Sequence, residues 1–306
     1  MTSAFTLIEM SIVLVVIGLI VGGILVGTDL VRAAEVRAQV SQIEKYNQAV
    51  NTFKGKYGYL PGDINAAAAA TFGFAARGTL PGTGDGNGLI QGVSNNLAAD
   101  NFPVRGETLA FFGDLGTAGL IEGSYSLDTP TANFGTITGS SIDLYFPPAK
   151  INPGRGNHLM VYSNNSVNYL LLEAFIGILY ATGIEIGGPG LTVKQAYMID
   201  TKIDDGNPQT GKVTAQYLDP WGPEFQAWSC GGCGFQLTGN QGAYDPTTNG
   251  AVVAGDGVAT AGSTATCYDN SATTSGTPGV AGATEHYSIE INSGNKMNCA
   301  LSFQFQ

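Results

Sequence analysis

Residues 4–27 read AFTLIEMSIVLVVIGLIVGGILVG. From Phe5 to Val26 the only ionisable side chain is that of Glu9. In helical form this run measures about 33 Å, because each residue adds about 1.5 Å, and that length matches the hydrocarbon core of a bilayer. The stretch therefore predicts a helix that can span a membrane, with the rest of the chain following it.

Glu9 is the unusual part of this helix. A carboxylate inside a bilayer is costly unless it has a partner. An ordinary signal anchor or a cleaved secretory signal does not place one near the start of its apolar run, and this run continues without a break into a second helical pattern. If the chain is cut after Ala4, the free ammonium of Phe5 lies one turn from the carboxylate of the same or a neighbouring helix. The two charges can then cancel.

The sequence FTLIEMSIVLVVIGLIVGGIL, preceded by a small residue, resembles the class III signal of type IV pilins and type II secretion pseudopilins. The resemblance implies that a prepilin peptidase cuts between Ala4 and Phe5 and methylates Phe5. It also implies that Glu9 guides assembly into a helical filament by pairing with a neighbour's N-terminal ammonium. Two features depart from the pattern: Ala4 stands where Gly is usual, and the leader MTSA has no Lys or Arg, which suggests a basic stretch upstream.

A second helical pattern follows the apolar run. Seven apolar residues recur at intervals of three and four: Val36, Val40, Ile43, Tyr46, Val50, Phe53 and Tyr57. This stripe predicts an amphipathic helix that continues the first one and ends at Gly58. We expect its other face to be wet, with Arg32, Arg37, Gln39, Gln42, Lys45 and Gln48. Within the apolar half, Gly18, Gly22 and Gly23 favour either local melting or close helix packing.

The rest of the chain mixes helical and strand patterns. Helices are predicted at 106–120, with Leu109, Phe112 and Leu115 inward, and from Thr192 to about Ile203, opened by a Thr192-x-x-Gln195 capping box. Alternation predicts strands in SSIDLYFPP, HLMVYS and VNYLLL, and a terminal hairpin from HYSIEIN and NCALSFQFQ. Several segments also look like one branch of large pilin-like proteins: KYGYLPGD, GDGNG, ETLAFFGDLGTAGLIEG and IDTKIDDGNPQTG.

The predicted fold class is α+β. The resemblance implies a pilin-like fold, in which a long N-terminal helix with a protruding apolar half packs on an antiparallel β-sheet head with long Gly-rich loops. We divide the chain into a leader remnant at 1–4, a transmembrane or filament-core helix at 5–27, an amphipathic stem at 28–57 and an acidic head at 58–306. Residues 240–284 are expected to form a long surface loop or an excursion at the edge of the sheet.

All four cysteines, Cys230, Cys233, Cys267 and Cys299, lie in the last third of the chain. A zinc site needs a second close pair beside CGGC, and Cys267 and Cys299 are far apart in sequence. We expect structural disulfides, and therefore an oxidising compartment. Four cysteines allow three pairings, which the sequence leaves open, although a bridge from Cys267 to Cys299 would tie the Gly-rich loop to the sheet.

Charge argues against nucleic acid as a partner. The chain has a formal net charge of −11, and residues 1–56 hold only four of its 24 Asp and Glu but five of its 13 Lys and Arg. The head is therefore strongly acidic, and no Lys or Arg occurs between Lys212 and Lys296. A nucleic-acid binder needs a basic surface to neutralise phosphates.

The search for catalytic motifs is negative, so we expect no enzyme. There is no GxSxG, HExxH or phosphate-binding loop, and the two histidines, His158 and His286, are far apart. No cofactor is predicted, although calcium is a candidate at two places. TGDGNGLI offers Asp85 and Asn87 in a loop resembling half an EF-hand, and Asp200, Asp204 and Asp205 form a second acidic group. Short Asx turns explain both groups equally well.

Together these features predict a structural filament subunit. The resemblance implies as partners copies of the chain or related pilins, a prepilin peptidase, an inner-membrane assembly platform, and membrane lipid before assembly. It implies an inner-membrane location first and then a periplasmic or cell-surface filament. Pilus and secretion pseudopilus remain open. The alternative is a membrane-tethered extracytoplasmic binding domain or enzyme with a simple N-terminal anchor.

Overall fold

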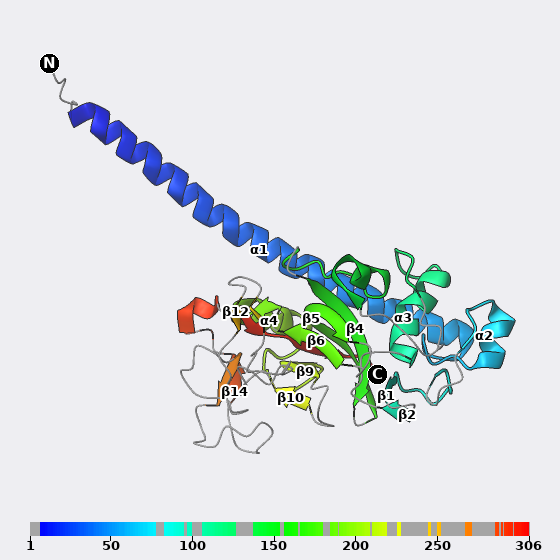
Figure 1. The fold of residues 1–306 in the computed structure, drawn as a ribbon. Helices are drawn as coiled ribbons and strands as arrows, with labels where there is room; N and C mark the ends of the chain where they lie inside the picture. The colour runs from blue at the N-terminus through cyan, green and yellow to red at the C-terminus, as the bar shows by residue number, and fades with distance from the viewer. Residues whose placement is uncertain are drawn as a thin grey trace.

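The structure is a computed structural model. It describes residues 7–77, 83–94, 97–99, 106–126, 137–153, 156–164, 166–179, 184–188, 190–208, 210–218, 225–227, 244–245, 250–251, 267–270, 285–287, 289, 291–295 and 297–305. It has a long N-terminal helix and an antiparallel sheet, which is an α+β layout. Figure 1 shows the helix running far beyond the head at its N-terminal end, while its C-terminal part lies along the head.

The helix α1 (Leu7–Tyr57) is one unbroken element of 51 residues. It ends at Gly58, whose φ of 77° is the left-handed conformation that favours glycine. The amide of Gly58 donates to the carbonyl oxygen of Lys54 at 2.9 Å. The predicted continuous helix and its end at Gly58 are confirmed.

The predicted apolar stripe is the face of α1 that packs on the head. Val36, Ile43, Tyr46, Val50 and Phe53 are all at most 6% exposed. Val40 and Tyr57 are partly buried and pack against the same core. The stripe is therefore confirmed.

The prediction that Gln39 is wet is wrong. Its side chain is 0% exposed, and its Oε1 accepts hydrogen bonds from the amides of Lys150 at 2.8 Å and Ile151 at 3.2 Å. Gln42, on the next turn, donates from Nε2 to the carbonyl oxygen of Pro148 at 3.0 Å. A polar residue at the edge of an apolar stripe looks solvent-facing in the sequence, because the pattern does not reveal which backbone groups lie opposite it.

Three shorter α-helices follow α1 among the described residues. α2 (Ala66–Phe72) is capped by Asn65, whose side chain accepts from the amide of Ala68. α3 (Gly106–Thr117) is where the sequence predicts it, and Leu109, Phe112 and Leu115 are buried. α4 (Val193–Ile203) begins with the predicted capping box, in which Thr192 and Gln195 bond to each other's backbone amides.

The main sheet has six strands, joined by antiparallel pairs around the long β5 (Val167–Leu179). β5 pairs with β3 (Ile137–Thr138), β4 (Asn157–Asn164), β6 (Ile184–Gly188) and β16 (Leu301–Gln304). β16 also pairs with β8 (Val213–Thr214). The predicted strands at 158–163 and 167–172 are therefore confirmed as β4 and the first half of β5.

Five further pairs of short strands are antiparallel too. They are β1 (Gly92–Ser94) with β2 (Leu97–Ala99), β7 (Leu191–Thr192) with β15 (Met297–Cys299), β9 (Gln216–Leu218) with β10 (Phe225–Ala227), β11 (Tyr244–Asp245) with β12 (Gly250–Ala251), and β13 (Tyr268–Asn270) with β14 (Glu285–Tyr287). Parts of the predicted 240–284 loop thus form strands, and most of that stretch lies outside the described residues.

Two strand predictions are wrong. The terminal hairpin does not form, because β14 pairs with β13, and residues 291–294 make a 3-10 turn, η2 (Ile291–Gly294). The terminal residues instead pair with β7, β5 and β8. The first half of the strand predicted in SSIDLYFPP (140–148) instead lies in the 3-10 helix η1 (Gly139–Leu144), in which Ile142 is buried and Leu144 is 52% exposed. Alternation defines which side chains share a face, but it does not identify the partner strand.

Candidate functional site

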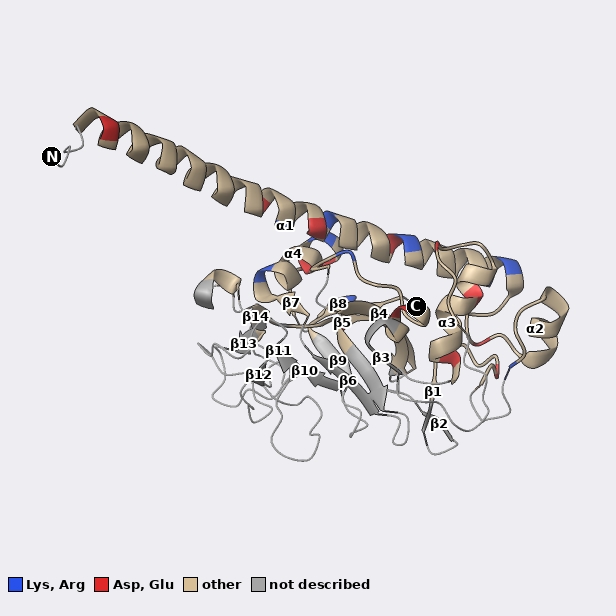
Figure 2. Ribbon diagram, turned by 45° about the horizontal axis from the view of Figure 1, so that its top comes forward, with Lys and Arg blue, Asp and Glu red and all other residues tan. Residues whose placement is uncertain are grey.

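The projecting half of α1 is the most distinctive surface of the molecule. Every large apolar side chain from Leu7 to Val31 is between 48% and 92% exposed. Charged residues are almost absent from this projecting part and gather where α1 lies along the head (Figure 2). Apolar exposure on this scale marks a surface that another apolar phase or protein covers.

The same segment is long and apolar enough to cross a membrane, and none of it is buried against the head. A core helix of a soluble protein also passes a test of length and composition, but it is buried in its own fold. The projecting half of α1 can therefore serve as a membrane anchor or a signal sequence. Of these two, the sequence predicts a helix that can span a membrane.

Glu9 lies in the first turn of α1 and is exposed. A negative charge is favourable at this end of a helix, because the unpaired amides of the first turn carry partial positive charge. Ala4 and Phe5, the predicted processing residues, lie outside the described residues. The pairing of Glu9 with Phe5 of another copy therefore stays a prediction.

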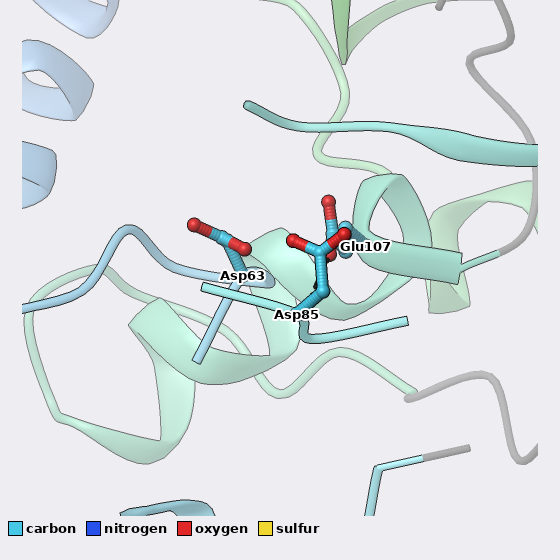
Figure 3. Close-up of side chains that lie close together, drawn as sticks. All are labelled: Asp63, Asp85 and Glu107. Atoms are coloured by element: carbon cyan, nitrogen blue, oxygen red, sulfur yellow. Dashed lines mark hydrogen bonds between the residues drawn. The ribbon is translucent and has the colours of Figure 1, made fainter. Parts of the chain in front are cut away.

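A group of three carboxylates, two of them buried, lies beside the C-terminal end of α1. Asp63, Asp85 and Glu107 point toward one another in Figure 3, and each offers an oxygen within 4.8 Å of the others. Asp63 and Glu107 are at most 1% exposed, whereas Asp85 is exposed. They come from the turn after α1, from the GDGNG loop and from the first turn of α3.

The two buried carboxylates bind the backbone of the GDGNG loop. Glu107 accepts from the amides of Gly84 at 2.8 Å, Asp85 at 3.3 Å and Gln91 at 3.0 Å. Asp63 accepts from Gly86 at 2.7 Å and Gly88 at 2.8 Å. These acids therefore supply hydrogen-bond acceptors to the amides of a loop whose backbone is not paired with a strand.

Asp85 and Asn87 form consecutive Asx turns in that loop. Oδ1 of Asp85 accepts from the amide of Asn87 at 2.9 Å, and Oδ1 of Asn87 accepts from Leu89 at 2.7 Å. Burial is the main reason that the pKa values of Asp63 and Glu107 are raised, and their mutual repulsion adds to it for Glu107. The oxygens of Asp63, Asp85 and Glu107 can also hold a cation such as calcium, so the calcium expectation stays a prediction here.

The second acidic group is also brought together, since Asp200, Asp204 and Asp205 offer oxygens within 4.8 Å of one another. Asp200 accepts from the amide of Gly206 at 3.1 Å and from the hydroxyl of Tyr287 at 2.8 Å. Burial raises the pKa of Asp200 to about 7.

The other two acids of this group bind the following loop. Asp204 accepts from the amides of Lys212 and Val213, and Asp205 accepts from Asn207 at 2.8 Å and from Oγ1 of Thr210 at 2.7 Å. Both acidic groups thus contain the Asx turns that the sequence offered as the alternative to calcium.

A disulfide joins Cys267 to Cys299, across 32 residues of sequence. It ties the segment around β13 to β15, as expected for the bridge between the Gly-rich stretch and the sheet. Cys230 and Cys233, the remaining candidates, lie outside the described residues. The expectation of a structural disulfide is therefore confirmed for one pair.

Two grooves lie along α1, and neither has a catalytic arrangement. One, of about 390 Å³, is lined by residues that include Gln42, Lys45, Glu122, Tyr125 and Lys150. The other, of about 400 Å³, lies between α1 and the ends of β8 and β16. Among their described lining residues, no histidine or cysteine stands beside a carboxylate, which is the usual arrangement of an activated nucleophile or base.

The two histidines are not paired with each other. His286 is exposed, and His158 is 5% exposed with both ring nitrogens bound, Nδ1 to the carbonyl oxygen of Gly156 at 2.7 Å and Nε2 to Asp143 at 2.8 Å. Because both partners are acceptors, this arrangement leaves the ring no free nitrogen with which to act as a general base.

Comparison with protein-family models, with curated proteins and with solved structures finds no match to this chain. The resemblance of its N-terminal segment to pilins therefore rests on the residues of that segment.

The sequence did not single out Asp63, Glu107 or Asp114, three of the buried acids of the head. Asp114 accepts from the amide of Gly62 at 2.7 Å and pairs with Arg77 at 2.6 Å, and both side chains of this ion pair are at most 3% exposed. A usable signal was present in GETLAFFGD, where Glu107 and Asp114 stand seven residues apart in an apolar helix. That spacing places both carboxylates on one face.

Proposed function

We propose that the chain is a non-enzymatic subunit of a filament of the type IV pilus or type II secretion pseudopilus kind. The observation that carries this proposal is the projecting half of α1, an apolar rod whose side chains are left uncovered by the described part of the chain. A bilayer and a bundle of identical helices are the two surroundings that can bury such a rod on all sides.

The proposal assigns these two surroundings to successive stages. Before assembly, residues 5–27 are held in the inner membrane, with the head on the extracytoplasmic side, where the Cys267–Cys299 disulfide is stable. After cleavage before Phe5 by a prepilin peptidase, an inner-membrane platform moves the helix into a bundle of copies or related subunits. The filament is then periplasmic or on the cell surface.

Glu9 is the proposed assembly contact. A carboxylate in an apolar surrounding is costly unless a positive charge lies beside it. In the proposed filament the N-terminal ammonium of Phe5 from a neighbouring copy supplies that charge and sets the stagger between the two helices.

The alternative is a membrane-tethered binding domain or enzyme that uses α1 only as an anchor. It is supported by the same apolar exposure, and by the cation-binding geometry of the two acidic groups. This alternative predicts an uncut N-terminus and no role for Glu9 in self-association.

The test compares Glu9→Gln with Glu44→Gln. Glu44 is an exposed acid in the part of the same helix that lies along the head. Each variant and the unchanged protein are measured in the membrane fraction and in sheared or secreted filaments. We expect normal membrane levels for all three, and a loss of filaments only for Glu9→Gln, because an amide keeps the size of the side chain but removes its charge.

Mass spectrometry of the mature protein provides the second part of the test. A methylated N-terminal Phe5 supports the filament proposal. An intact N-terminus on the purified protein, or wild-type filament yield from Glu9→Gln, would favour the simple-anchor alternative.

A further inference from the structure

The segment from Ile142 to Ile151 lies between the sheet and α1 and is bonded to both. On the sheet side, the amide of Ala149 donates to Asn157 O at 2.8 Å and that of Leu159 donates to Pro147 O at 3.0 Å. On the helix side it is bound by Gln39 and Gln42 of α1. We refer to residues 142–151 as the bridging segment.

His158 adds a side-chain bond between β4 and this segment. Its Nε2 lies 2.8 Å from Oδ1 of Asp143, and its Nδ1 lies 2.7 Å from the carbonyl oxygen of Gly156. A carbonyl oxygen and a carboxylate are both acceptors, so only the doubly protonated ring donates to both of them.

Several groups surround the ring. Glu173 stands directly opposite His158 in the register of β4 and β5, so both side chains lie on the same face of the sheet, and it is 2% exposed. Asp143 approaches from η1, and the ring of Phe175 lies edge-on at 6.2 Å. The pKa of Tyr125 is raised mainly by burial, and the charge of Asp143 adds to this effect.

We propose that His158 is a proton-dependent clasp that holds the bridging segment, and through it the sheet, against α1. The charged ring binds Asp143 and Gly156 together. When the ring loses a proton, the Nδ1–H bond to the carbonyl of Gly156 is retained, because that carbonyl is held in place by the amide of Phe175, which donates to it at 2.9 Å. Nε2 then presents a lone pair to the Asp143 carboxylate.

Two acceptors in contact repel each other, and Asp143 is the partner that is able to leave. Its side chain is 59% exposed, whereas that of His158 is only 6% exposed, so the carboxylate can turn into water at little cost. The bridging segment then keeps its backbone bonds but loses its charge-assisted one. This inference does not depend on the proposed filament, because it concerns contacts within one chain.

The experiment is hydrogen exchange of the full chain in detergent micelles at about pH 5.5 and about pH 8.5, on either side of the range in which histidine ordinarily titrates. The readouts are the protection factors of the Ala149 and Ile151 amides, corrected for intrinsic exchange. The amides of β16, a strand with no titratable side chain, serve as reference for any general change in stability. We expect protection of the bridging segment, relative to β16, to be roughly tenfold higher at the lower pH, as the loss of a charge-assisted hydrogen bond predicts.

Three variants separate the clasp from other effects of pH. His286→Gln, at the exposed histidine, is expected to keep the pH dependence. His158→Gln is expected to remove it. Asp143→Asn is also expected to remove it, because an amide can donate to the neutral ring and accept from a charged one after turning over.

Asp143→Asn changes an exposed side chain and leaves the core intact, so the test stands even if His158→Gln fails to fold. Equal relative protection at both pH values in the unchanged protein would overturn the proposal. So would a pH dependence that survives in Asp143→Asn.

Discussion

Residues 7–31 and residues 36–57 belong to one unbroken helix, yet the more apolar half is the exposed one. The second half has a single apolar stripe, and this stripe is covered by the head. The first half is apolar all round, so no single face of a head could cover it. The periodicity of the apolar residues, rather than their number, therefore determines which half of α1 the chain itself can bury.

Aromatic packing holds the buried half to the head. Phe53 is 0% exposed, and the ring of Phe74 in the head lies 5.3 Å from that of Phe53 and 4.9 Å from that of Tyr57. In the projecting half no comparable contact exists among the described side chains, and Leu19 is 72% exposed. Truncating one large side chain in each half of α1 therefore tests this difference in burial directly.

The largest expected effect is that of Phe53→Ala. It should lower the free energy of unfolding of the head by about 3–5 kcal/mol, because it removes a buried ring and leaves a cavity. Leu19→Ala, the control, should leave that free energy unchanged. Denaturant unfolding of both variants in micelles, followed by near-UV circular dichroism, measures the difference. Equal effects of the two changes would show that α1 is not divided as described.

A smaller effect is expected at Gln39. Replacement by Ala leaves the amide of Ile151 without its acceptor inside the protein, which should cost about 1–3 kcal/mol in the free energy of unfolding. The effect should lie toward the lower end, because Gln42 also accepts from the amide of Lys150, at 3.2 Å. Gln48→Ala, at an exposed position of the same helix, is the matched control and should change little. A neutral result at Gln39 would mean that these bonds add nothing to the docking of α1.

The helices of the fold could be predicted from the sequence, because a helix is determined by neighbours three and four residues apart. The stripe of α1, the end at Gly58 and the capping box of α4 all depend on local spacing. The partners of β16 could not be predicted, because they are residues 169–172 and 213–214, more than eighty residues away. Period-two alternation is the same whichever strand lies alongside.

The acidic groups also show that sequence patterns reveal contacts between residues close in the chain and miss contacts that only the fold creates. Asp85 and Asn87 were noticed because they are close in sequence, and their Asx turns are local. Asp63 and Glu107 join Asp85 only through the fold, since they come from separate segments before and after the loop. Gln39 was mistaken for a wet residue for a related reason: its partners, Lys150 and Ile151, are more than a hundred residues away.

The third prediction concerns pH and separates the head from the projecting helix. The pKa of Asp200 is raised by burial to about 7, and those of Asp63 and Glu107 are raised as well. Acids with raised pKa values bind protons more tightly in the folded state than in the unfolded state. Their contribution to stability is therefore complete below about pH 4 and is lost as the pH rises through about 7 for Asp200.

We therefore expect the melting temperature of the head to rise by a few degrees when the pH falls from about 8 to about 5. Asp200→Asn should reduce this dependence, because the amide can still accept from Gly206 and donate to Tyr287 but does not titrate. Glu9→Gln, on the projecting half, should leave the dependence as it is. A head whose stability falls on mild acidification would contradict the burial of these carboxylates.

The smallest effect is expected at Gly22, in the middle of the projecting half. A Cβ added there meets no atom within 4 Å, so alanine fits without strain. Alanine favours the helix by about 1 kcal/mol over glycine, but this gain is local. The free energy of unfolding of the head should therefore not change, whereas hydrogen exchange at the amides of residues 18–26 should slow. If exchange in the unchanged protein is faster there than in the rest of the projecting half, and slows in Gly22→Ala, the glycines favour local melting. If it is no faster there, the glycines are better explained by close packing against a neighbouring helix.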